Sequence, residues 1–133
     1  MNREIAPPKV LFLVDDDPDD HDIFQEALKV IDDSIVCYFA HDGKEAINKL
    51  QDALLLPDML FLDLNMPVMN GKDCLKALKG HKDLKHIPVI IYSTASAEKE
   101  KSTCIELGAR DFISKPPQFN ALVETLTATL KKH

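Results

Sequence analysis

A length of 133 residues fits one domain of ordinary size and leaves no room for a second core. Apolar residues make up 45% of the chain, so a packed core is expected and global disorder is not. The formal net charge is −6, with 22 acidic against 16 basic residues. This balance argues against a nucleic-acid backbone or an anionic membrane as a partner, because both attract clustered lysine and arginine.

The N-terminal residues lack the basic start, apolar stretch and small-residue cleavage site of a secretion signal. No apolar run approaches the ~20 residues that a membrane-spanning helix requires. The three cysteines (Cys37, Cys74 and Cys104) are widely spaced, without a CxxC pair, and are predicted to be reduced thiols. These features predict a cytoplasmic protein.

Strand-like and helical patterns alternate from the beginning of the chain. Lys9–Val14 is a nearly continuous apolar run, which is typical of a strand buried on both faces. Asp17 is a suitable N-cap and Pro18 a suitable first residue for the helix that follows. A second strand is predicted over Ser34–Phe39, and Asp42 begins a second helix.

The same alternation continues to the end of the chain. A third strand is predicted over Met59–Leu62, followed by a loop over residues 65–71 and a third helix. The fourth strand is Val89–Tyr92, and the fourth helix, from about Ala97, begins almost wholly polar. A short fifth strand, Asp111–Ile113, precedes an amphipathic last helix.

Five strand–helix units in strict alternation predict an α/β fold with a five-stranded parallel sheet, doubly wound, with helices on both faces. In such three-layer sheets the working site lies beyond the carboxyl ends of the strands, at a topological switch point. That edge is where chemistry is expected.

Polar residues stand at four of these strand ends. The first strand is followed by Asp15 and Asp16, the third by Asp63, the fourth by Ser93, and the fifth by Lys115. Carboxylates brought together repel one another unless a cation compensates their charge. Oxygen-only ligation suits Mg²⁺, and the absence of histidine and cysteine from this set argues against zinc.

The remaining strand-end groups suit a phosphoryl group. Lys115 offers a fixed positive charge and Ser93 a hydroxyl donor, while an ionised Asp63 has the chemistry to attack phosphorus and form an acyl phosphate. Each residue alone has an ordinary explanation as a turn residue, a helix cap or a solvated charge. Their joint placement at successive strand ends is what favours a site.

At this point the chain resembles a known family, the receiver domain of bacterial response regulators, also called CheY-like. The resemblance covers nearly the whole chain, from about Lys9 to Leu130. The matching segments are LVDDD (13–17), LFLDLNMPVMNG (60–71), IPVIIYST (87–94) and GARDFISKP (108–116). It implies the (βα)5 flavodoxin-like, CheY-like three-layer sandwich.

The resemblance also implies roles for the acidic residues. Asp63 matches the phosphoacceptor, which is also a metal ligand. Asp16 matches the direct ligand of Mg²⁺, and Asp15 the carboxylate that acts through water. Asn65 matches the residue whose backbone carbonyl binds the metal.

The phosphoryl-binding and switch positions follow in the same way. Ser93 matches the switch hydroxyl and Lys115 the family's lysine, which makes the Lys115–Pro116 bond a candidate cis peptide. Phe112 matches the aromatic switch residue but lacks the hydroxyl of the more common tyrosine. Thr94 stands where alanine is common, so it is expected to crowd or rebond the phosphoryl group.

The expected organisation is an N-terminal extension over residues 1–8, a receiver domain over 9–130 and a C-terminal tail over 131–133. We expect a stand-alone response regulator that is phosphorylated by a sensor histidine kinase or a phosphotransfer protein. It would signal to a downstream protein through the face of the fourth helix, fifth strand and fifth helix, with homodimerisation possible through that face. Short receivers with Asp-Pro-Asp-Asp after the acidic pair include partners of phytochrome-type kinases.

Three alternatives remain at this point. The first is an aspartyl phosphohydrolase. Such enzymes typically have an Asp-x-Asp pattern at the nucleophile, whereas this chain has Asn65 in place of the second aspartate. The second is a receiver-like interaction module that does not use phosphate. The third, a flavin-binding protein, would require a Ser/Thr/Gly-rich phosphate loop after the first strand. We expect a protein that modifies only itself and is not an enzyme in the usual sense.

Overall fold

The computed structural model describes residues 10–53, 56–66 and 68–133. The strands are β1 (Val10–Val14), β2 (Val36–Ala40), β3 (Met59–Leu62), β4 (Val89–Ser93) and β5 (Asp111–Ser114). The helices are α1 (Pro18–Ile31), α2 (Gly43–Gln51), α3 (Gly71–Gly80), the 3-10 helix η1 (Ala95–Glu100), α4 (Lys101–Glu106) and α5 (Phe119–Lys132). Lys9, the predicted start of the first strand, lies outside the described residues.

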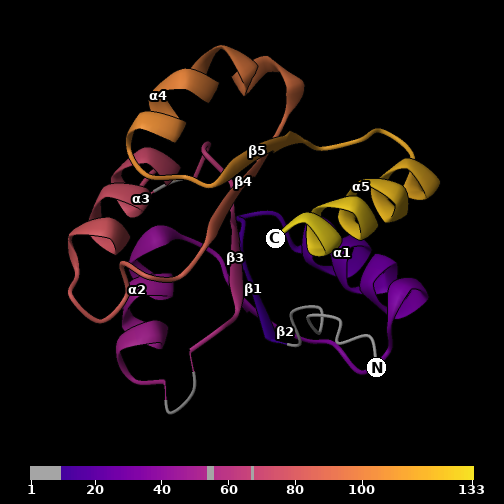
Figure 1. Cartoon of the computed structure of the whole chain (residues 1–133), viewed down its shortest axis with the longest axis horizontal. Helices are drawn as coiled ribbons and strands as arrows, with labels where there is room; N and C mark the ends of the chain where they lie inside the picture. The colour runs from indigo at the N-terminus through magenta and orange to yellow at the C-terminus, as the bar shows by residue number, and fades with distance from the viewer. Residues whose placement is uncertain (1–9, 54–55, 67) are drawn as a thin grey trace, which may run out of the picture.

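All five strands are parallel and lie in the order β2-β1-β3-β4-β5. Helices α1 and α5 cover one face of the sheet, and α2, α3 and α4 cover the other (Figure 1). This strand order and layering are those of the doubly wound, flavodoxin-like fold, so the predicted fold class is confirmed. The order changes direction between β1 and β3, and the carboxyl ends of these two strands flank the expected site.

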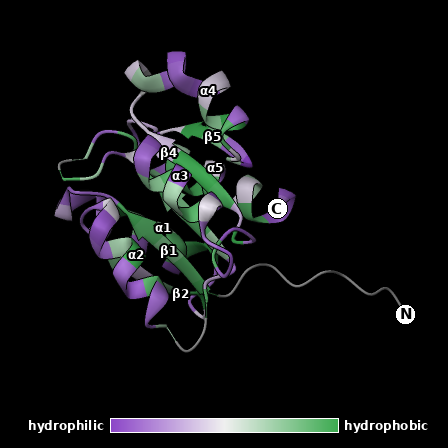
Figure 2. Ribbon diagram, turned by 90° about the vertical axis from the view of Figure 1, so that its left-hand side faces the viewer, coloured by the Kyte–Doolittle hydropathy of each residue, from purple (hydrophilic) through white to green (hydrophobic). Residues whose placement is uncertain are grey.

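The core consists of two layers, one on each face of the sheet. In β1, Leu11 and Leu13 pack with α1 and α5, whereas Phe12 and Val14 pack with α2 and α3. This period of two explains why the strand is apolar throughout, since both of its faces are buried. The strands are accordingly hydrophobic along their length, while the helices are hydrophilic on their outer sides (Figure 2).

The predicted helix starts at Asp17 and Asp42 are confirmed. The Asp17 side chain accepts a hydrogen bond from the Asp19 amide at 2.9 Å, and the Asp42 side chain accepts one from the Glu45 amide at 2.8 Å. Each cap satisfies one of the amide donors that a helix leaves unpaired at its first turn.

The predicted fourth helix differs from the observed one. The polar stretch forms the 3-10 helix η1, and regular α-helix begins only at Lys101. Among the described side chains of residues 96–106, only Ala97 and Cys104 are buried. These two buried side chains are small and lie seven residues apart. Packing against the core therefore does little to impose α-helical geometry on the segment.

The described chain contains no cis peptide bond, so the Lys115–Pro116 peptide is trans. The prediction of a cis bond is therefore wrong for this structure. The trans form of an X–Pro bond is favoured by about 0.5–1 kcal/mol. Here the chain runs straight out of β5, with the Lys115 amide donating to the Ser93 carbonyl at 2.6 Å.

Within the described ranges, none of the helices combines the length and the hydrophobicity needed to cross a bilayer. Cys74 and Cys104 are buried free thiols and Cys37 is a half-buried one.

Candidate functional site

The strand ends converge as the parallel arrangement requires. The Asp15 amide donates to the Ala40 carbonyl at the end of β2, and the Asp63 amide donates to the Val14 carbonyl at the end of β1. These backbone bonds fix where the carboxylates that follow β1 and β3 emerge. Together with the Lys115–Ser93 backbone bond, they hold the predicted residues at one edge of the sheet.

Asp63 is buried, with 5% of its surface exposed, and both of its carboxylate oxygens have partners. Its Oδ1 accepts from the Ser93 hydroxyl at 2.8 Å and from the Asn65 amide at 3.2 Å. Its Oδ2 lies 3.2 Å from Lys115 Nζ. The carboxylate is thus oriented by one hydroxyl, one amide and one ammonium group.

Asp15, Asp16 and Asp63 form a group of carboxylates whose nearest oxygens lie within 4.8 Å of one another. Asp15 is fully buried, and its Oδ1 accepts from the Asp17 amide at 3.0 Å. Asp16 is exposed. The group therefore combines two buried acids with one that opens to solvent.

Lys115 supplies the positive charge at this edge. Its Nζ lies 2.7 Å from Asp15 Oδ2, 2.7 Å from Asp20 Oδ2 and 3.2 Å from Asp63 Oδ2. It also lies 5.5 Å from the centre of the Tyr92 ring, within the range of a cation–π contact. Burial lowers the pKa of Lys115, but the surrounding carboxylates outweigh burial and raise it overall, so the lysine is charged.

Carboxylates outnumber positive charges at this edge of the described structure, where several aspartates surround Lys115. Burial, together with the charge of Asp63, raises the pKa of Asp15 to about 7 in spite of Lys115 and the Asp17 amide. The contact of Asp15 Oδ2 with Lys115 is an ion pair without hydrogen-bond geometry, so this buried oxygen has no hydrogen-bond donor among the described residues. A buried, under-satisfied carboxylate oxygen in a group of three acids fits a hard divalent cation such as Mg²⁺, which prefers oxygen ligands.

Two residues that the sequence prediction did not include contact this site. Asp20, in the first turn of α1, accepts from Lys115 Nζ. His21 is buried, its Nε2 lies 2.6 Å from the Asp15 carbonyl, and its ring stacks on Phe39. An acid in the first turn of a helix is ordinary, because it favours the helix dipole, so sequence alone did not distinguish Asp20.

Three other predicted site residues lie in different surroundings. Asn65 is exposed and donates its amide to Asp63, while the prediction that its carbonyl binds metal stays a prediction. Thr94 is exposed, and its hydroxyl contacts Ser96 at 2.9 Å rather than a carboxylate of the described site. Phe112 is buried in the layer on the α2–α4 side, so its ring already points into the core.

The β3–α3 connection approaches Asp63 closely. The Gly71 amide donates to the Leu64 carbonyl at 2.9 Å. A Cβ atom at residue 71 would lie 2.3 Å from the Asp63 carbonyl oxygen and 2.5 Å from Leu64 Cα. Glycine is therefore required where α3 begins beside Asp63.

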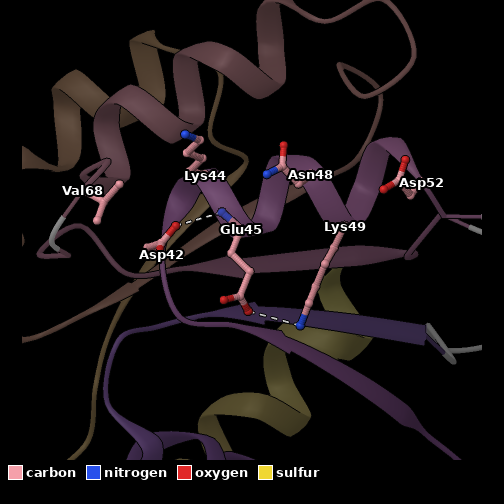
Figure 3. Close-up of a pocket in the computed structure, with 7 residues that line it drawn as sticks. All are labelled: Asp42, Lys44, Glu45, Asn48, Lys49, Asp52 and Val68. Carbon is pink, nitrogen blue, oxygen red and sulfur yellow. Dashed lines mark hydrogen bonds and ion pairs between the residues drawn. The ribbon is translucent and has the colours of Figure 1, made fainter.

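A separate pocket lies along α2 and reaches Val68 (Figure 3). Its lining is mixed in charge, and Glu45 and Lys49, which lie one turn apart on α2, pair at 3.2 Å. It includes none of the strand-end carboxylates. The acidic edge of the sheet therefore remains the candidate functional site.

Comparison with known proteins agrees with this geometry. The sequence-family model of the response regulator receiver domain matches residues 11–127. The transcriptional regulatory protein CpxR of Escherichia coli is 34% identical over 122 residues, covering 92% of this chain and 49% of CpxR. Response regulator Rcp1 of Synechocystis is 34% identical over 122 residues, covering 86% of this chain and 82% of Rcp1.

Solved structures agree as well. The phosphorylated cyanobacterial phytochrome response regulator RcpA has a TM-score of 0.82 at 29% identity, covering 91% of this chain and 90% of RcpA. The Mn²⁺-bound form of Rcp1 has a TM-score of 0.79 at 29% identity, covering 91% of each chain.

The fold and the acidic edge define a receiver domain of two-component signalling. The chain belongs to the response regulator receiver family. It spans about half the length of CpxR and most of the length of Rcp1.

Proposed function

We propose that this protein accepts a phosphoryl group on Asp63, in a reaction that requires Mg²⁺ held by Asp15, Asp16 and Asp63, with the Asn65 carbonyl as a further ligand. The donor is the phosphohistidine of a sensor kinase or a phosphotransfer protein. The single observation that carries this proposal is the orientation of a buried carboxylate by Ser93 and Lys115, both of which also suit phosphoryl oxygens.

In this reaction one oxygen of Asp63 forms a bond to phosphorus as the donor's nitrogen–phosphorus bond breaks, and the released imidazole takes up a proton. A bound divalent cation supplies positive charge that offsets the negative charge on the phosphoryl oxygens. Lys115 offers ammonium protons to the same oxygens, and Ser93 turns its hydroxyl from Asp63 toward them. Phe112 and Thr94 are proposed to adjust to that movement.

The relatives suggest how the signal is used. Rcp1 and RcpA are response regulators, and RcpA is described as a phytochrome response regulator. We propose by analogy a cytoplasmic response regulator whose kinase is of a related type. It would act through a downstream protein target, dimerise through the α4–β5–α5 face, and catalyse nothing beyond its own phosphorylation and dephosphorylation.

The test is intact-protein mass after incubation with acetyl phosphate. Wild type should gain one phosphoryl group in Mg²⁺ and none in EDTA, because Asp63 is the acceptor and the cation is required. Asp63→Asn should gain nothing. Asp73→Asn, which removes an exposed acid from α3, should behave as wild type. Labelling of Asp63→Asn would sink the assignment, and no labelling of any protein, by acetyl phosphate or a kinase, would favour a phosphate-independent interaction module.

Metal binding gives a second expected result. At about ten times its dissociation constant, Mg²⁺ should raise the thermal midpoint of wild type by about 3–6 °C, because it binds the folded chain alone. Asp16→Asn should lose most of this shift, since it removes one ligand without disturbing the core. Asp22→Asn, an exposed position on α1, should keep it. Equal shifts in all three proteins, measured by circular dichroism, would contradict a site at Asp16.

A further inference from the structure

Asp20 is set apart from the other acids of α1 by its contact with Lys115. It is the third residue of the helix, and its Oδ2 lies 2.7 Å from Lys115 Nζ across 95 residues of sequence. Its side chain is 25% exposed, whereas the Asp15 and Asp63 side chains are 1% and 7% exposed. It is not a member of the group of three carboxylates that fits a cation.

An ammonium group has three N–H donors and no acceptor. In this structure three carboxylates, those of Asp15, Asp20 and Asp63, surround the Lys115 ammonium. Two of them belong to the proposed metal site, where a divalent cation would compete with the lysine for their charge. Of the three carboxylates, Asp20 alone lies outside the proposed metal site, so its contact with Lys115 would persist when a cation binds.

A lysine side chain without a partner is long and flexible, and its strongly hydrated ammonium is free to turn toward solvent. The Lys115 side chain is 14% exposed, so part of it already reaches solvent. A hydrogen bond to an ionised acceptor is stronger and more directional than a neutral one. The contact with Asp20 thus keeps the ammonium over the acceptor.

We propose that Asp20 is a positioning residue for phosphoryl transfer, which holds Lys115 so that its remaining N–H donors face the phosphoryl group on Asp63. This inference rests on the proposed function and extends it to a residue of α1. Asp20 itself touches neither the acceptor nor the phosphoryl group.

The test uses beryllofluoride, a phosphoryl analogue that binds an acceptor carboxylate, with Mg²⁺ and ¹⁹F NMR on the full chain. If the proposed function holds, the three fluorine atoms should face three different groups: the cation, the Ser93 hydroxyl and the Lys115 ammonium. Asp20→Asn, which removes the charge but keeps the shape, should shift one fluorine resonance. Asp20→Glu, which restores the carboxylate, should return that resonance toward its wild-type position. Asp22→Asn, which removes the same charge two residues further along α1, should leave all three resonances in place.

Each outcome decides between the proposals. A wild-type adduct whose three resonances are unchanged in Asp20→Asn would overturn the positioning role and leave the proposed function standing. Equal shifts in Asp20→Asn and Asp22→Asn would also overturn it, because they would reflect only the lost charge. Absence of an adduct in wild type, with the protein shown to be folded, would overturn the proposed function and this inference with it.

Discussion

Replacing Gly71 with alanine should destabilise the protein by about 1–3 kcal/mol, the range for a forced overlap in a packed interior. The added methyl group would lie 2.3 Å from the Asp63 carbonyl oxygen and 2.5 Å from Leu64 Cα. Both of these are backbone atoms, which move only if the end of β3 moves with them. Urea denaturation should therefore show a lower midpoint, and the proposed Mg²⁺-dependent phosphorylation should fall because Asp63 is displaced.

Gly80 provides the matched control, because nothing lies within 4 Å of a Cβ built there. It is the last residue of the same helix, α3. Gly80→Ala should be neutral or stabilising by up to about 1 kcal/mol, since alanine loses less backbone entropy on folding than glycine. Similar stability of the two variants would contradict the close approach of α3 to the Asp63 backbone.

Replacing Lys115 with methionine should destabilise the metal-free protein by about 3 kcal/mol at pH 8, because it leaves buried carboxylates without their cation. Burial already raises the pKa of Asp15 to about 7, and loss of the lysine would raise it further, so in the folded state it would exceed that of the unfolded chain by more than in wild type. Groups shifted in this direction make the folded state less stable as the pH rises. The deficit should therefore be smaller at pH 5.5 than at pH 8.

Mg²⁺ should stabilise Lys115→Met more than it stabilises wild type, because no ammonium competes for the carboxylates. The control is Lys72→Met, which removes a lysine paired with Glu100 at 3.0 Å on a surface where both side chains are about one-third exposed. Such a pair contributes little, so this variant should lose far less stability and respond to Mg²⁺ as wild type does. Denaturation in EDTA and in Mg²⁺ measures both effects. Equal losses of stability in the two variants would contradict the proposed charge compensation of the buried carboxylates by Lys115.

Much of the architecture was predictable because burial leaves a direct trace in the sequence. The apolar run ending at Val14 predicted a strand covered on both faces, and Leu13 and Val14 do pack into opposite layers. The caps at Asp17 and Asp42 were predictable because they depend on residues only two and three positions away. The strand-end rule also predicted that Asp63 and Lys115 would meet.

The features that the sequence did not predict depend on long-range contacts or on weak local preferences. Asp20 became distinct only through a lysine in β5–α5, and no local signal separates it from Asp19. Thr94 follows a buried strand, yet its hydroxyl lies beside Ser96 on the surface. The 3-10 geometry of η1 reflects missing packing, which residue types alone do not reveal.

The η1–α4 segment rests on the interior chiefly through Ala97 and Cys104, and it shares a cleft with Leu64 and Asn65, which directly follow Asp63. Burying two small side chains stabilises a segment only slightly, since apolar burial contributes about 25 cal/mol per Å². A phosphoryl group, by contrast, adds a charge of about −1.5 to −2. A lightly anchored segment therefore borders the position where the largest change in charge is proposed, so we expect any change of outward shape to occur there and to leave the two core layers in place.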